Sequence, residues 1–159
     1  MKTEYVNPFI SAATSVIEMV ISEPPQRGSM TARPQVFTSQ QINVVYGVTG
    51  PVQGQVIFGM SVQTATNIAS RMVGNPIFSF DALAASAIAE LGNMISGNAM
   101  TSLSNAGFDS DITPPTIIRG SNVKISTMDI PALVIGFTLG TLGEFELTVS
   151  VRERPARAA

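Results

Sequence analysis

The chain has 159 residues, of which 45% are apolar and 13% are charged, and its nine Lys and Arg against eleven Asp and Glu give a net charge of −2. This length suits a single domain with a sizeable core, while the charge balance and the lack of a basic run argue against nucleic-acid binding. Cysteine and histidine are both absent, which excludes disulfides, thiol nucleophiles, Ser-His-Asp triads and the usual zinc sites.

Two further features bear on location and assembly. No apolar stretch approaches the roughly 18 uninterrupted residues of a membrane span, and the N-terminal segment contains Glu4 and Glu18 instead of a signal-peptide core. We therefore expect no membrane association and a cytoplasmic location. Charged residues stand at about half their usual share, so we expect part of the surface to be buried in an oligomer.

The first element expected is a helix over residues 7–22. Apolar residues recur there at helical spacing, Asn7 offers an N-cap and Pro8 suits the first helical position. A Glu-Pro-Pro sequence is expected to end it. The next stretch, residues 24–33, has turn chemistry and little apolar content, so we predict an exposed connection.

Strands are expected next, over residues 35–38, 42–48 and 55–60, where side chains are β-branched or alternate in polarity. A Thr-Gly-Pro sequence around Gly50 separates the last two strands as a hairpin turn would. The simplest outcome is that these three strands pair with one another in antiparallel order.

The second half of the chain begins with a helix predicted over residues 61–73, which a Gly-Asn-Pro sequence ends. A long helix follows. Further strands are predicted over residues 123–128, 133–139 and 145–151, the last two joined by a turn at Gly140. Residues 1–152 are expected to form one domain, and residues 153–159 a disordered basic tail.

This order of elements predicts an α+β fold, with a mainly antiparallel sheet and long helices on one face. A parallel, doubly wound sheet is the alternative, disfavoured because adjacent strands lack crossover helices. The hairpins around Gly50 and Gly140 also suggest two similar halves.

The long helix is the most informative element, with about 24 residues between a cap near Ser79 or Asp81 and a stop at Gly107. Its core face is predicted from helical spacing to comprise Leu83, Ala84, Ala87, Leu91 and Ile95. The other side presents a polar stripe, which we define as Ser86, Glu90, Asn93 and Gly97.

Polar residues on the outward face of a helix are most often only solvated, but two features favour a function here. Gly92 and Gly97 lie within the helix, where together they cost about 2 kcal/mol relative to alanine, so we expect close approach of another backbone. Glu90 has no helical partner three or four residues away and is available for a cation elsewhere. The Asn93 amide is a poor base but can orient water for attack on a phosphoryl group whose metal another protein holds.

The pattern Ser86-x3-Glu90-x2-Asn93, within the run SAIAELGNMISGNA and followed by DITPPTII, resembles the signature of the CheC/CheX/FliY family of chemotaxis phosphatases, and most of all the CheX type. The resemblance covers the order of elements along nearly the whole chain. It implies a pseudo-two-fold CheC-like fold. It also implies a homodimer joined through sheet edges.

The resemblance further implies a hydrolase that removes the aspartyl phosphate of a phosphorylated CheY-like receiver. Asn93 would position the attacking water and Glu90 would pair with the receiver's lysine, while Ser86, Gly92 and Gly97 would contact the partner. No cofactor or metal of its own is implied, because the receiver supplies Mg²⁺. On the first helix the matching pattern is Thr14-x3-Glu18-x2-Ile21, so only one working site is expected.

Two other readings remain open. The polar stripe could dock a receiver or a flagellar-switch component without hydrolysis, as a non-catalytic adaptor module. The chain could also be a structural dimerisation domain. Because a pure adaptor would be expected to replace Asn93, its presence favours the phosphatase.

Overall fold

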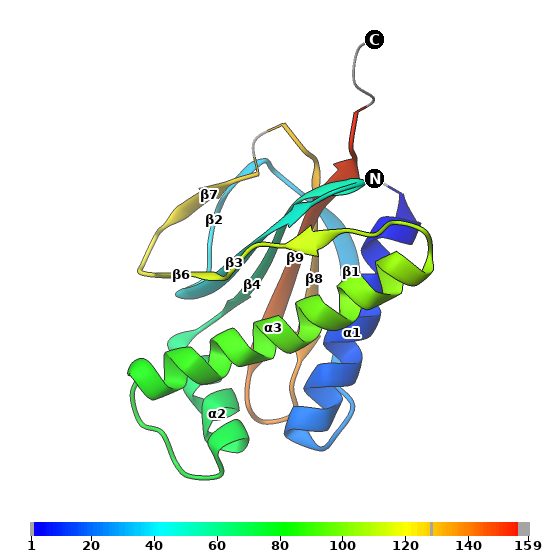
Figure 1. The fold of residues 1–159 in the computed structure, drawn as a ribbon. Helices are drawn as coiled ribbons and strands as arrows, with labels where there is room; N and C mark the ends of the chain where they lie inside the picture. Colours follow the sequence, from blue (N-terminus) through cyan, green and yellow to red (C-terminus); the bar gives the residue numbers. More distant parts are fainter. Residues whose placement is uncertain (1, 128, 156–159) are drawn as a thin grey trace.

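The structure is a computed structural model that describes residues 2–127 and 129–155. Within these residues, three helices lie against one face of a seven-stranded antiparallel sheet, and a two-stranded sheet stands apart from it (Figure 1). This arrangement confirms the predicted α+β class. The elements in chain order are α1 (Thr3–Ile21), β1 (Gln26–Arg33), β2 (Val36–Thr38), β3 (Ile42–Thr49), β4 (Val52–Met60), α2 (Val62–Val73), α3 (Ala82–Asn105), β5 (Asp111–Ile112), β6 (Thr116–Arg119), β7 (Lys124–Ser126), β8 (Ala132–Thr138) and β9 (Glu144–Glu153).

The large sheet has the order β1-β8-β9-β4-β3, and both β5 and β6 pair with the outer edge of β3. The β3–β4 and β8–β9 hairpins are as predicted, and they meet at the centre through antiparallel pairing of β4 with β9. The expectation that β2 would pair with β3 is wrong, because β2 pairs with β7. Phe37 of β2 and Ile125 of β7 pack with Ile57 on the face of the large sheet away from the helices.

The strand pairings have a pseudo-two-fold symmetry. Exchanging β1 with β6, β2 with β7, β3 with β8 and β4 with β9 leaves every pairing among these strands unchanged. The same operation exchanges α1 with α3, which pack against each other. The two similar halves predicted from the hairpins around Gly50 and Gly140 are therefore present, and α2 lies in the connection between them.

The core lies between the helices and the sheet. Alternate residues of β3 and β4 face the helices, so that Val44, Tyr46, Val56 and Phe58 are almost completely buried. Burying an aliphatic or aromatic side chain of this size stabilises a fold by about 1.5–3 kcal/mol. The helices are therefore held against the sheet mainly by apolar packing.

Helix α1 begins earlier than predicted, at Thr3, and the capping role expected of Asn7 is wrong. Tyr5 is 2% exposed and its ring packs edge-on against Phe108, with the ring centroids 5.0 Å apart. Pro8 lies inside the helix, where it removes one backbone hydrogen bond. Burial of the first turn offsets that loss, a tertiary effect that local spacing does not reveal.

Residues 26–33 are a strand rather than the exposed connection expected from their turn-forming composition. They form β1, which pairs with β8 at the edge of the sheet, and seven of its eight residues are exposed. An edge strand of this kind is held by its backbone hydrogen bonds and needs few apolar side chains. Polarity alone therefore gave the wrong expectation for this segment.

The last strand extends beyond the predicted domain end at residue 152. Glu153 pairs with Val52, and the backbone N–H of Arg154 donates to the Pro51 carbonyl at 2.7 Å. Residues 156–159 of the expected tail lie outside the described residues, as does Met128 at the end of the strand expected over residues 123–128.

Within residues 2–127 and 129–155, no helix combines the length and apolar character needed to cross a membrane.

Candidate functional site

Helix α3 has the length and the cap that its sequence predicts. The Asp81 carboxylate accepts a hydrogen bond from the Ala84 N–H at 2.9 Å, and Gly107 follows the helix with a φ of 95°. Four of the five residues predicted for its core face are buried. Leu83 is the exception at 53% exposure, since its helical position is about 20° from that of Glu90. It therefore borders the polar stripe.

The structure places all four residues of the polar stripe on the exposed side of α3. Glu90 forms no ion pair within the part of the chain that is described, so its carboxylate is free to meet an external cation. Ser86 lies one turn before it. Helix α3 thus presents the hydroxyl of Ser86, the carboxylate of Glu90 and the carboxamide of Asn93 along one exposed face.

Asn93 is hydrogen-bonded to a tyrosine of the sheet, Tyr46, whose role the sequence analysis did not predict. Tyr46 rises from the helix-facing side of β3, is completely buried, and donates a hydrogen bond from its hydroxyl to Asn93 Oδ1 at 2.9 Å. The same hydroxyl lies 3.2 Å from the Ala89 carbonyl oxygen. The available sequence signal was the inward position of Tyr46 on an alternating strand, which does not say what lies above it.

Gly92 explains how the tyrosine reaches the helix. This glycine is buried, and a Cβ atom placed on it would lie 2.5 Å from the Tyr46 hydroxyl oxygen. The close approach expected at Gly92 therefore comes from the chain's own sheet rather than from a partner. At Gly97, by contrast, a Cβ atom would meet nothing within 4 Å, so its predicted partner contact stays a prediction.

Burial and a neighbouring charge together set the protonation state of Tyr46. Burial raises the pKa of Tyr46 well above its usual range, and the negative charge of Glu90 raises it further. A raised pKa keeps the phenol protonated at neutral pH. Tyr46 is therefore a hydrogen-bond donor throughout the physiological range.

The DITPPTII segment closes the sheet edge beside α3. The Gly47 N–H donates to Thr113 Oγ1 at 2.8 Å, and β6 begins directly after the two prolines. At the far end of β6, Arg119 donates to the Phe80 carbonyl at 3.0 Å, just before the α3 cap. This segment therefore fixes both the strand beneath the site and the start of the helix.

The matching pattern on α1 has no equivalent chemistry. Thr14 donates to the Ile10 carbonyl of its own helix at 2.8 Å, and Ile21 is only 4% exposed. Glu18 is exposed. Without a carboxamide at the third position, this helix cannot position water as Asn93 could.

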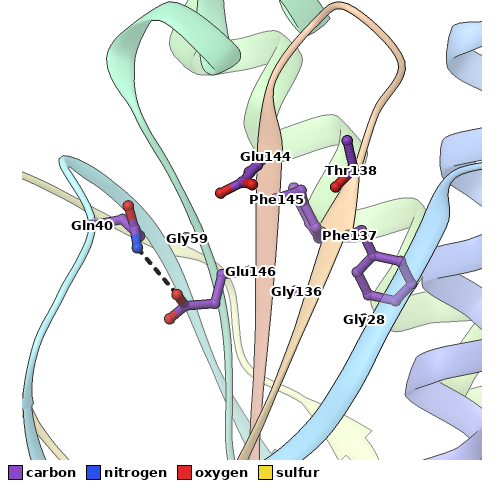
Figure 2. A pocket seen from close by; sticks show the side chains of 9 residues that line it. All are labelled: Gly28, Gln40, Gly59, Gly136, Phe137, Thr138, Glu144, Phe145 and Glu146. Atoms are coloured by element: carbon purple, nitrogen blue, oxygen red, sulfur yellow. Dashed lines mark hydrogen bonds between the residues drawn. The ribbon is translucent and has the colours of Figure 1, made fainter.

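A separate hollow lies on the sheet face away from the helices, with a volume of about 250 Å³ (Figure 2). Its floor is formed by Gly59 and Gly136 on either side of Glu146. Glu146 is already paired with Arg33 and accepts a hydrogen bond from Gln40 at 3.1 Å. The hollow therefore lies on the other side of the sheet from the polar stripe and shares no residue with it.

The site can orient water and bind a cation, but it has few other chemical resources. No group of three or more Asp, Glu, His or Cys side chains suited to a metal ion occurs among residues 2–127 and 129–155. Asn93 does not titrate usefully, and the sequence has no histidine that could activate Ser86 as a nucleophile. Such a helix face can complete an active site that another protein supplies.

Comparison with known proteins agrees with this geometry. Residues 42–138 match the family model described as chemotaxis phosphatase CheX. The CheY-P phosphatase CheX of Thermotoga maritima is 31% identical over 153 residues, which cover 96% of this chain and 98% of that protein. The residues matched by the family model span the positions of the polar stripe and of Tyr46.

Solved structures show the same fold. A chain from the crystal structure of the CheX–CheY–BeF₃–Mg²⁺ complex of Borrelia burgdorferi is 33% identical with a TM-score of 0.82, covering 94% of this chain and 98% of its own length. A CheC-like superfamily protein from Shewanella has a TM-score of 0.86 at 21% identity, covering 96% and 99%, and shows the fold alone. On the family match and the 31% identical relative, the chain belongs to the CheX family of chemotaxis phosphatases.

Proposed function

We propose that this chain hydrolyses the aspartyl phosphate of a phosphorylated CheY-like receiver protein. The observation that carries the proposal is the exposed Asn93, held on a rigid helix beside an unpaired carboxylate. The family relationship supports it, and so does the similarity to a chain crystallised in a CheX–CheY complex.

In the proposed reaction, the oxygen of a water molecule attacks phosphorus as the bond between phosphorus and the aspartyl oxygen breaks. The products are the free aspartate carboxylate of the receiver and inorganic phosphate, which takes up the water protons or releases them to solvent. Asn93 contributes by holding the water in line, since positioning supplies much of the rate in phosphoryl transfer. The receiver would hold the Mg²⁺ ion, which would supply positive charge beside the phosphoryl oxygens.

Glu90 is assigned to binding rather than to proton transfer. Its free carboxylate would form a charge-assisted hydrogen bond with the receiver's active-site lysine and hold the two proteins in register. Ser86 and the exposed Leu83 flank it on α3 and would contribute contact area. Gly97 leaves open space on the same face for the receiver to approach.

The decisive experiment follows the decay of a phosphorylated receiver. A receiver is phosphorylated with a small-molecule donor, the donor is removed, and loss of phosphate is measured with and without the chain. Asn93→Ala should lower the stimulated rate about a hundredfold, because the water is no longer held. Asn98→Ala is a matched control, since Asn98 is exposed on the same helix but lies about 120° from the polar stripe.

Two outcomes would count against this function. If the parent chain leaves receiver decay unchanged while still binding the receiver, the adaptor alternative is correct. Equal activity of Asn93→Ala and the parent would show that hydrolysis does not use this carboxamide.

We also propose that the chain is a homodimer joined through sheet edges, located in the cytoplasm with its receiver. The outer edge of β1 supports this assembly, because its residues are almost all exposed and it has no second neighbour among the described strands. Sedimentation velocity over a range of concentrations tests it. A monomer at every concentration would contradict the dimer without affecting the phosphatase.

A further inference from the structure

The contact between Tyr46 and Asn93 joins the sheet to the exposed face of α3. A tyrosine hydroxyl has one hydrogen, and two acceptors lie within its reach, Asn93 Oδ1 at 2.9 Å and the Ala89 carbonyl at 3.2 Å. The Ala89 carbonyl can be served by the backbone N–H four residues on, within the helix. Among residues 2–127 and 129–155, no other side-chain hydrogen bond is seen for Asn93, so the shorter bond is the one that matters for its conformation.

This hydrogen bond leaves Asn93 able to act outward. Its Oδ1 has a second lone pair and its Nδ2 has two hydrogens, so a water molecule can still be held by the same amide. An exposed asparagine without such a contact samples several rotamers. The buried Tyr46 hydroxyl restricts the Asn93 rotamers from the sheet side of α3, which a docked receiver would not occupy.

The local packing shows that the contact is built into the fold. Tyr46 is completely buried, its ring packs against Phe58 at a centroid distance of 5.8 Å, and it can reach the helix only because residue 92 is glycine. Gly92 within a helix costs about 1 kcal/mol relative to alanine. The chain therefore gives up helix stability at the position that lets the hydroxyl reach Asn93.

We propose that Tyr46 is a positioning residue for the phosphatase reaction, and that its hydroxyl holds the Asn93 carboxamide in the orientation that receives the attacking water. This inference rests on the proposed function. It assigns to Tyr46 no contact with substrate and no proton transfer, since the phenol stays protonated at neutral pH.

The test compares two single-atom deletions in the full chain. Tyr46→Phe removes the hydroxyl and keeps the ring, and it should lower kcat for receiver dephosphorylation about tenfold through loss of positioning. KM should change less than about twofold, because Glu90 and the exposed contacts remain. Tyr5→Phe alters the chain's other tyrosine, which is buried on α1, and should leave kcat unchanged.

A double variant separates positioning from general damage to the fold. In the Asn93→Ala background, adding Tyr46→Phe should cause no further loss of kcat, because the hydroxyl acts only through the amide it holds. A tenfold loss that persists in this background would overturn the proposal. So would a Tyr46→Phe protein with the parent's kcat.

A second measurement does not depend on activity. The side-chain amide signal of Asn93, identified by its disappearance in Asn93→Ala, should be well ordered in the parent by ¹⁵N relaxation and should lose order in Tyr46→Phe. An unchanged signal would overturn the proposal whatever the kinetics. If the parent chain fails to accelerate receiver decay, the proposed function is wrong, while the amide signal still decides whether Tyr46 holds Asn93.

Discussion

Helices α1 and α3 occupy equivalent positions in the pseudo-two-fold fold, yet only α3 carries the complete pattern of serine, glutamate and asparagine. Both carry a glutamate at the middle position of the pattern, Glu18 and Glu90, and both glutamates are exposed. At the third position α1 has the buried Ile21 where α3 has the exposed Asn93. The scaffold alone therefore does not make a site.

The residues around that third position differ as well. In the aligned patterns, Val20 of α1 stands where α3 has Gly92, and Val20 packs against the core. The helix-facing residues of β8, the counterpart of β3, include Ile135 and Phe137, which have no hydroxyl. The carboxamide, the glycine and the tyrosine meet where α3 lies over β3, and the equivalent positions on α1 and β8 lack all three.

The largest effect is expected from making α1 resemble α3. Ile21→Asn would bury an amide among apolar side chains, so it should lower the free energy of unfolding by about 4 kcal/mol without creating a second site. Urea unfolding and the receiver-decay assay measure the two expectations. Ile21→Val, expected to cost about 1 kcal/mol, is the control, and a stable Ile21→Asn protein with raised activity would show that α1 needs only the amide.

A smaller effect should distinguish the two glutamates. Glu90→Ala should weaken binding to a phosphorylated receiver by about 1.5–3 kcal/mol, because one charge-assisted hydrogen bond is lost. Glu18→Ala should leave the affinity unchanged, since nothing beside Glu18 completes a site. Isothermal titration gives both values, and equal losses in the two variants would mean that the receiver does not distinguish the helices.

The smallest effect concerns the two glycines of α3. Gly97→Ala has open space around the added Cβ atom and should raise the free energy of unfolding by about 1 kcal/mol through helix propensity. If a receiver backbone approaches there, the same change should weaken receiver binding. Thermal unfolding and titration measure the two effects.

Gly92→Ala provides the contrast, because its added atom would meet the Tyr46 hydroxyl. We expect that variant to be destabilised by about 1–3 kcal/mol. Equal stability of the two variants would contradict the close packing described for Gly92.

The sequence predicted α3 well and its surroundings poorly, for a physical reason. The ends of α3 and the exposure of Glu90 and Asn93 depend on helical periodicity and a local cap, which neighbouring residues determine. Leu83 was misplaced because it lies at the boundary between the two faces. The role of Tyr46 could not be predicted, since it depends on a residue 47 positions away in the chain.

The strands show the same difference between features set by neighbouring residues and features set by distant ones. The two hairpins were predictable because their turns are local, whereas the pairing of β2 with β7 and of β1 with β8 depends on contacts between distant segments. The early start of α1 likewise depends on Phe108, which packs on Tyr5. Segments whose structure is decided by a distant partner were the ones predicted wrongly.

The position of β9 has a consequence for how the protein is made. The last strand of the described sheet lies at its centre, between β8 and β4, and its pairing with β4 joins residues about 90 positions apart in the chain. During synthesis β4 can pair with β9 only after residues 144–153 have left the ribosome. Until then one edge of β4 is unpaired. We therefore expect folding to be slow, because it waits for a long-range pairing, and we expect the incomplete chain to be prone to aggregation.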